Sequence, residues 1–281
     1  MDVKLTTLEQ LIERCWNSAE VETAKAVVQK HPSPSEEQLT FLFSGELRRA
    51  IGDASSARRI ETAFLADLRR SIPRLDLGVA RRAGGLVARV NLHGRWHEGN
   101  VSAADLGIVI TRPLVRLSPG RINVEFRRDH PTGLLAQAKL GRAVGPTEGG
   151  HAWGRLTQSQ AGLFPKRRGY YSLLLYRLNG QNSDELEPFA WQLCRNYTVR
   201  QVKKWLRSDA FPGEISSSEV LRRLFARMIG TEDPKVIQTI IDPTGAGAHS
   251  IELQIFWPDG SGPPPSFPLC ELQHKRQEVH H

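Results

Sequence analysis

The segment Gly133–Arg142 constrains the fold more than any other part of the chain. It is short and mostly apolar and is bounded by turn-forming residues, a pattern typical of a buried β-strand. Successive side chains of a strand point to opposite faces, so Gln137 and Lys139 are expected on one face with Leu135 beside them. The other face is expected to be apolar and buried; it carries Leu134, Ala136, Ala138 and Leu140. An amide oxygen and an ammonium are therefore expected side by side on one strand, and we expect an acidic residue to be their partner.

The acidic partner is expected upstream, in the segment Ala103–Ile110, where Asp105 opens a second hydrophobic strand. The separation between Asp105 and Gln137 is longer than a plain hairpin permits, because a further alternating strand, Arg121–Arg128, is expected between them. Glu125 in that intervening strand is the alternative acid. We rank Asp105 first because it heads its strand, where a carboxylate meets the end of the sheet.

An acid at the head of one strand followed by Gln-x-Lys on another resembles the restriction-endonuclease-like PD-(D/E)xK superfamily. The glutamine in place of the usual acid resembles its Mrr-type branch. The resemblance covers roughly Arg58–Leu178, which is less than half of the chain. It implies an α/β (α+β) fold with a restriction-endonuclease-like core, in which a central mixed sheet is flanked by helices. The core of this superfamily runs in the order helix, three strands, helix, strand.

The resemblance implies a Mg²⁺- or Mn²⁺-dependent endonuclease that hydrolyses phosphodiester bonds, with DNA as the expected substrate and restriction or antiphage defence as the expected setting. Asp105, the Gln137 side-chain oxygen and the Ala138 carbonyl would hold the metal, with Glu61 as a further ligand. Oxygen ligands suit so hard a cation. Lys139 would orient or activate the attacking water and stabilise charge in the transition state.

Two alternatives from other classes remain open. The first is a protein that keeps the nuclease fold without its chemistry and acts as a nucleic-acid-binding or assembly subunit. The second is a helical interaction protein without an active site, in which the motif arises by chance. A partner protein subunit or a homodimer is compatible with the nuclease hypothesis, because recognition can reside in another chain.

Glu61 belongs to a helix expected over 54–72, and it falls on the side of that helix that carries the apolar residues Phe64 and Leu68. An acid on a buried-facing side is costly unless it is paired or bound to a metal. The helix of the superfamily that matches this one often supplies an acidic ligand, and Glu61 stands at that place. The alternative is a glutamate at the rim that pairs with Arg58 or Arg69.

The chain is expected to divide into three parts. Residues 1–52 form an N-terminal helical pair, in which Ser35 and Gln38 make a capping box for the second helix. Residues 53–180 form the nuclease-like core. Residues 181–281 form a mostly helical region, with helices over 186–206, 217–229 and 234–241, a late strand over 250–257 and a proline-rich tail.

The chain is basic, with a formal net charge of +8 and a pI near 9.7. Such a surface attracts polyanions, and nucleic acid is the polyanion that fits the hypothesis above. The second helix of the core is expected around 156–164 and its last strand over 170–178. The cluster Lys166, Arg167 and Arg168 lies between them. Contact of this cluster with phosphates is one interpretation, and a solvated turn is the other.

The three cysteines are odd in number and far apart, which argues against a disulfide framework or a zinc site. No apolar run approaches the ~20 residues that a membrane-spanning helix needs, and the first residues lack the apolar core of a signal peptide. We therefore expect a cytoplasmic protein with no membrane partner.

Overall fold

The computed structural model describes residues 3–30, 34–73, 84–93, 106–117, 123–144, 150–158, 161, 170–179, 185–195, 197–241, 249–258 and 267–268. Its helices are α1 (Thr6–Lys30), α2 (Glu36–Ser56), α3 (Arg59–Ser71), α6 (Val199–Ser208), α7 (Ser217–Phe225) and α8 (Pro234–Ile241). Its strands are β1 (Val87–His93), β2 (Leu106–Leu117), β3 (Asn123–Ala143), β4 (His151–Trp153), β5 (Tyr171–Asn179), β6 (Glu185–Leu186), β7 (Ala190–Leu193), β8 (Ile215–Ser216), β9 (His249–Phe256) and β10 (Phe267–Pro268).

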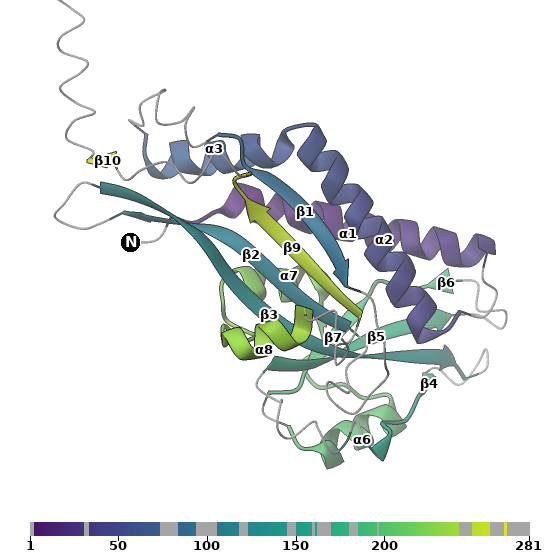
Figure 1. Cartoon of the computed structure of the whole chain (residues 1–281). Helices are drawn as coiled ribbons and strands as arrows, with labels where there is room; N and C mark the ends of the chain where they lie inside the picture. Colours follow the sequence, from purple (N-terminus) through teal and green to yellow (C-terminus); the bar gives the residue numbers. More distant parts are fainter. Residues whose placement is uncertain are drawn as a thin grey trace, which may run out of the picture.

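These strands form one mixed sheet (Figure 1). The strand order is β1-β9-β2-β3-β5-β7-β8; β4 and β10 also pair with β3, and β6 pairs with β5. β2 and β3 are antiparallel, whereas β3 and β5 are parallel. The predicted central mixed sheet flanked by helices is thus confirmed.

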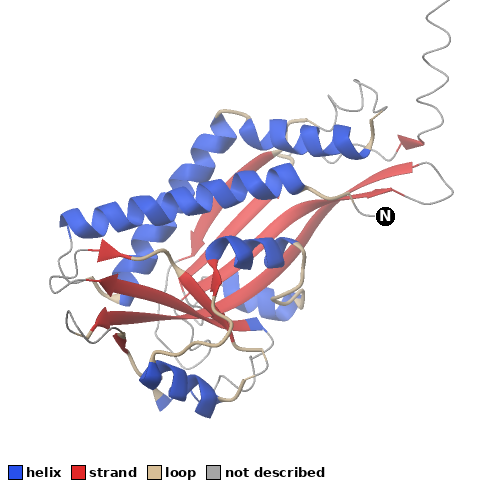
Figure 2. Ribbon diagram, turned by 180° about the vertical axis from the view of Figure 1, so that it is seen from behind, coloured by secondary structure: helices blue, strands red, loops and turns tan. Residues whose placement is uncertain are grey.

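Two hydrophobic clusters cover the two faces of the sheet. The larger contains apolar residues of α1, α2, α3 and α7 packed on one face, and Figure 2 shows α1 crossing in front of the sheet from that side. The smaller contains residues of α6 and α8 packed on the other face. Leu134, Ala136 and Ala138 belong to the larger cluster, and Leu135 belongs to the smaller. The predicted alternation of this strand is confirmed.

Helix α2 begins as the sequence predicts. The Ser35 hydroxyl accepts a hydrogen bond from the backbone N–H of Gln38, and the Gln38 side chain accepts one from the backbone N–H of Ser35. This capping box satisfies two donors that have no partner within the helix. It also fixes the direction of the first residue of α2, Glu36, which matters for the site described below.

Helix α1 is capped by a carboxylate from another helix. The two oxygens of Asp67 in α3 accept hydrogen bonds from the backbone N–H groups of Thr7 (2.9 Å) and Leu8 (3.0 Å). Asp67 is 0% exposed, and Arg70 donates to it at 3.2 Å. A buried anion at the positive end of a helix satisfies free amides and complements the helix dipole. Asp67 therefore joins α1 to α3.

We expect Asp67→Asn to lower the free energy of unfolding by about 1–2 kcal/mol, because the amide brings an NH₂ group toward a buried N–H donor and removes the charge. Urea denaturation measures the change. Asp53→Asn is the matched control, since Asp53 is exposed near the end of α2. Equal stability of the two variants would show that the cap contributes nothing.

β2 and β3 form one long hairpin, and here the sequence prediction was wrong. The segments expected as separate strands, 121–128 and 133–142, belong to a single strand that runs through Pro131. Pro131 pairs with Thr111 of β2 next to an irregularity in the register at Arg112 and Leu114. Gly133, expected in a turn, instead permits close packing of α8, since a Cβ there would lie 2.8 Å from Cδ1 of Ile240.

The region after residue 180 contains more strand than expected. The helix predicted over 186–206 is wrong in its first part, which contains the end of β6 and all of β7, and is confirmed over 199–206, which belongs to α6. Alternation explains the error, because Trp191 faces the larger cluster and Ala190 the smaller. α8 was predicted with the observed bounds, and β9 to within one residue. β7, β8 and β9 all belong to the same sheet as the strands of the expected core.

Candidate functional site

The candidate site lies on β3 where this strand passes beyond the start of β2. Gln137 and Lys139 are on the face that carries Leu135, as predicted, and β5 runs parallel beside them. Gln137 is 0% and Lys139 4% exposed. The side chain of Lys139 is thus almost fully buried, although it carries an ammonium group. A buried ammonium requires a partner.

The hairpin places β3, which carries Gln137 and Lys139, next to β2, which begins one residue after Asp105. The first residue of β2, Leu106, pairs with Ala136 of β3. Asp105 comes directly before Leu106 in the sequence, and Gln137 comes directly after Ala136. Asp105 itself lies outside the described residues. The long separation in sequence is thus accommodated by extending one hairpin, so that no additional strand intervenes between β2 and β3.

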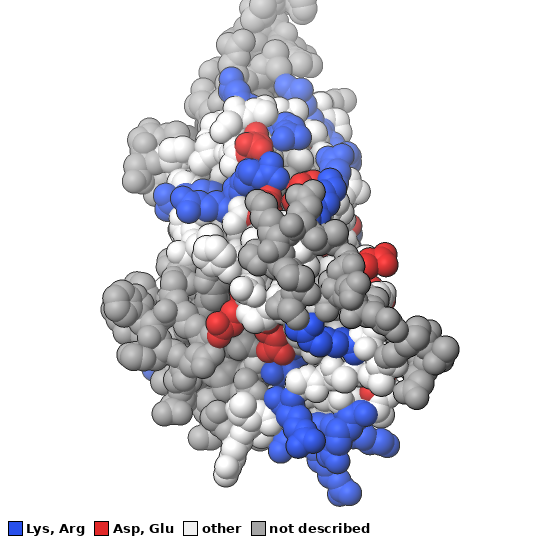
Figure 3. Space-filling model, turned by 90° about the vertical axis from the view of Figure 1, so that its right-hand side faces the viewer, with Lys and Arg blue, Asp and Glu red and all other residues white. Residues whose placement is uncertain are grey.

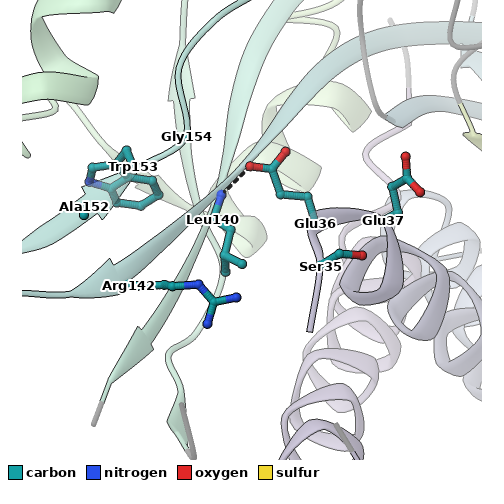
Figure 4. Close-up of a pocket in the computed structure, with 8 residues that line it drawn as sticks. All are labelled: Ser35, Glu36, Glu37, Leu140, Arg142, Ala152, Trp153 and Gly154. Atoms are coloured by element: carbon teal, nitrogen blue, oxygen red, sulfur yellow. Dashed lines mark hydrogen bonds between the residues drawn. The ribbon is translucent and has the colours of Figure 1, made fainter. Parts of the chain in front are cut away.

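Glu36 of α2 is the partner of Lys139. The carboxylate oxygen Oε2 of Glu36 lies 3.6 Å from Nζ of Lys139. The other oxygen, Oε1, accepts a hydrogen bond of 2.9 Å from the backbone N–H of Leu140 (Figure 4). On this side of β3, the pairing with β2 ends at Ala136 and the pairing with β4 starts at Gly141. Among the described residues, no strand pairs with this edge of β3 between Ala136 and Gly141, and Glu36 occupies that interval.

Gln137 is held by a tyrosine of the neighbouring strand. The hydroxyl of Tyr171 in β5 donates to Oε1 of Gln137 at 3.3 Å, and Tyr171 is 2% exposed. The amide nitrogen of Gln137 donates at 3.4 Å to the carbonyl of Ala138. These contacts fix the side-chain oxygen of Gln137 beside Lys139 on a strand that is packed on both faces.

An open pocket of about 550 Å³ gives access to the Glu36 side of the site. Its lining comes from the start of α2, from β3 and from β4: Ser35, Glu36, Glu37, Leu140, Arg142, Ala152, Trp153 and Gly154 (Figure 4). Gly154 brings the backbone close to the ion pair, since a Cβ there would lie 3.2 Å from Oε1 of Glu36 and 3.9 Å from Cδ of Lys139. Glu36 is 26% exposed and Lys139 5% at their side chains. A solute in the pocket therefore meets Glu36 first.

The structure does not bring Glu61 to Gln137. Arg58 donates to both oxygens of Glu61 at 2.7 and 3.1 Å, and the backbone N–H of Gly85 donates to Oε1 at 3.0 Å. The Arg58 hydrogen bonds lower the pKa of Glu61. Gly85 leads into β1, whose first residue pairs with the last residue of β9. Gln137 lies at the opposite end of β9, because β2 pairs there both with the first residue of β9 and with Ala136. The contacts of Glu61 agree with the alternative, a glutamate at the rim that pairs with Arg58.

Of the remaining predicted residues, the structure describes the backbone of Glu125 alone. Glu125 belongs to β3 and pairs with Arg116 of β2, twelve positions before Gln137 on the same strand. At ~3.3 Å per residue, the backbones of these two positions are about 40 Å apart. Lys166, Arg167 and Arg168, like Asp105, lie outside the described residues.

The Gln137 side-chain oxygen and the Ala138 carbonyl are oxygen donors, the type that Mg²⁺ prefers, so the donor chemistry fits this ion. These two oxygens do not make a complete coordination shell. In the part of the chain that the structure describes, no three His, Cys, Asp or Glu residues form a group that could hold a metal. Asp105 would have to contribute a further ligand.

Glu36 was missed by sequence reasoning. The capping box at Ser35 and Gln38 predicts where α2 begins, and Glu36 is the first residue after the cap. Acids are common in the first turn of a helix because they interact favourably with the helix dipole. The position of Glu36 therefore has a local explanation and does not by itself indicate a functional role. The contact with β3 spans about a hundred positions in sequence and depends on packing, so no local signal announces it.

Comparison of the chain with protein-family models, with curated proteins and with solved structures gives no match. None of the helices in the described ranges is both long and apolar enough to cross a membrane.

Proposed function

We propose that this chain is a metal-dependent nuclease of the restriction-endonuclease-like type that hydrolyses phosphodiester bonds in DNA. The observation that carries the proposal is the position of Gln137 and Lys139 on one face of β3, with an adjacent antiparallel strand that starts one residue after Asp105. This arrangement is the one that the PD-(D/E)xK resemblance calls for.

The order of elements also supports the proposal. α3, β1, β2 and β3 follow one another, and β5 then returns parallel to β3. Between β3 and β5, the backbone N–H of Ala161 donates to the carbonyl of Thr157, a helical hydrogen bond at the place where the second helix of the core is expected. One departure from a simple meander is β9, which lies between β1 and β2.

In the proposed mechanism, Asp105, the oxygen of Gln137 and the carbonyl of Ala138 would hold Mg²⁺ or Mn²⁺. Such an ion, when bound, neutralises charge on the phosphoryl group and makes a bound water more acidic. Lys139 would orient the attacking water and stabilise the negative charge that develops on the phosphoryl oxygens. Glu36 would act as a positioning residue, since its carboxylate contacts both the Lys139 ammonium and the strand that carries it.

One observation favours the alternative of an inactive nuclease-fold protein that binds nucleic acid or assembles with a partner. Gln137 is fully buried and bonded to Tyr171, and Lys139 is almost fully buried and paired with Glu36. A protein that had lost its chemistry could retain these contacts for packing alone. Only activity separates the two functions.

Incubation of supercoiled plasmid with the protein tests the proposal. We expect nicked and linear products with Mg²⁺ or Mn²⁺ and none with EDTA. Gln137→Glu adds a carboxylate at a proposed ligand position, so it should tighten Mg²⁺ binding in calorimetry and retain some cleavage. If neither metal supports cleavage of DNA or RNA, the nuclease proposal is wrong.

A further inference from the structure

Helix α6 carries four cations on one stripe. Arg200, Lys203, Lys204 and Arg207 stand at positions i, i+3, i+4 and i+7, which fall on one side of a helix. The opposite side of α6 is buried in the smaller cluster through Val202, Trp205 and Leu206. Burial of the apolar side fixes the rotation of the helix, so the cationic stripe must face outward.

The charge of this stripe is not neutralised by the described part of the protein. No ion pair joins any of the four side chains to an acid in the described ranges, and α6 itself contains no acidic residue. Figure 3 shows Lys and Arg side chains gathered at the lower end of the molecule, the end at which α6 lies in Figure 1. Like charges held together in this way favour a polyanionic partner.

Strand β4 connects α6 to the candidate site. Asp209, the residue that ends α6, accepts hydrogen bonds from the backbone N–H of His151 (2.8 Å) and from Nε1 of Trp153 (2.5 Å) in β4. Trp153 lines the pocket beside Glu36 and Lys139. β4 therefore joins the C-terminal end of α6 to the lining of the pocket.

We propose that the α6 stripe docks the sugar-phosphate backbone of double-stranded DNA and guides the duplex to the pocket beside Lys139. The inference deepens the proposed function and rests on it for the identity of the polyanion. Seven residues of helix advance about 10 Å, a length over which one strand of DNA presents about three phosphates. A membrane surface fits less well, because membrane-binding helices present apolar residues with their cations, and no large exposed hydrophobic residue among those described lies on α6.

The test is the salt dependence of duplex binding, measured without divalent metal so that no cleavage occurs. The variant replaces Arg200, Lys203, Lys204 and Arg207 with glutamine. Each lost phosphate contact lowers the slope of log K against log salt by about 0.9, so we expect a slope shallower by about 2–4 and affinity at least about tenfold weaker at 100 mM salt. The matched control removes four exposed cations from the helices that cover the opposite face: Arg14, Lys25, Arg48 and Arg69. It should change the slope little.

In cleavage assays the α6 variant should raise KM while the rate at saturating DNA stays within about twofold of wild type, because docking contacts contribute to binding and not to the chemical step. Circular dichroism should report the wild-type fold for both variants, since seven of the eight positions are exposed and Lys203 is partly exposed.

Three outcomes would overturn the inference: an unchanged slope in the α6 variant, an equal fall of slope in the control, or α6-dependent binding of RNA or anionic vesicles without binding of duplex DNA. Cleavage with a normal slope in the α6 variant would reject the docking surface and leave the nuclease intact. α6-dependent DNA binding without cleavage would support the surface and reject the nuclease.

Discussion

Lys139→Ala should reduce the rate of DNA cleavage by about two orders of magnitude or more. This is the usual scale for the loss of one group that stabilises transition-state charge in a water-poor site. The buried position of Lys139 makes the effect larger than for a solvated ammonium, because a charge interacts more strongly where water is excluded. Single-turnover cleavage at saturating DNA measures the loss directly, and duplex binding without metal should remain near the wild-type value.

Glu36→Gln tests whether Glu36 positions Lys139. The amide keeps an oxygen that can accept from the N–H of Leu140, but it removes the negative charge beside Lys139. We expect kcat to fall about tenfold with KM unchanged, the pattern of a residue that positions a catalytic group. Full activity of Lys139→Ala would exclude Lys139 from the chemistry, and an equal loss of stability and activity in Glu36→Gln would assign Glu36 to packing.

Glu20→Gln should stabilise the protein by about 2–3 kcal/mol at pH 8 and have almost no effect at pH 4. Burial raises the pKa of Glu20 from 4.5 to about 7, although hydrogen bonds from Ser217, Trp16 and Phe189 oppose the rise. A pKa raised by folding means that the stability present below pH 4.5 is lost as the pH rises through about 7. Glutamine is neutral at every pH and escapes this loss. The lower figure allows for water that reaches a partly buried carboxyl group.

Urea denaturation at several pH values between 4 and 8 tests this prediction. Glu22→Gln is the control, because Glu22 lies two residues further along α1 at the surface and its hydrogen bond with Lys25 lowers its pKa. The control should gain no stability at high pH. A pH-independent difference between Glu20→Gln and the wild type would mean that Glu20 titrates normally in the folded protein.

Local sequence patterns predicted what local chemistry determines. The capping box at Ser35, the bounds of α8 and the two faces of the segment after Gly133 all follow from periodicity and hydrogen-bonding groups within a few residues. The continuity of β3 through Pro131 did not, because proline in isolation indicates a turn. In the described sheet β3 has only β2 beside it at this residue, so the missing N–H interrupts no ladder.

The sequence predicted the strand that carries the candidate site, but it did not predict the residues that contact Gln137 and Lys139. Alternation alone put Gln137 and Lys139 on one face. Nothing near them in sequence indicates that Tyr171 and Glu36 would contact them, because these contacts come from other strands and helices. The prediction of Glu61 as a metal ligand has the same weakness. The apolar residues of its helix predict an acid that faces inward, whereas Arg58 and the backbone of Gly85 bind Glu61 at the far end of the sheet.

The position of β9 determines the order in which this chain can fold. β9 lies between β1 and β2, yet the pairing of Leu106 with His249 joins segments about half of the chain apart. Closing so long a loop costs entropy before any contact compensates for it, and folding slows accordingly. During synthesis the β2/β3 hairpin can form early, whereas β1, which pairs in the described sheet with β9 alone, must wait for one of the last strands. Until β9 emerges, β2 presents an open hydrophobic edge, and the nascent chain is most prone to aggregate at this stage.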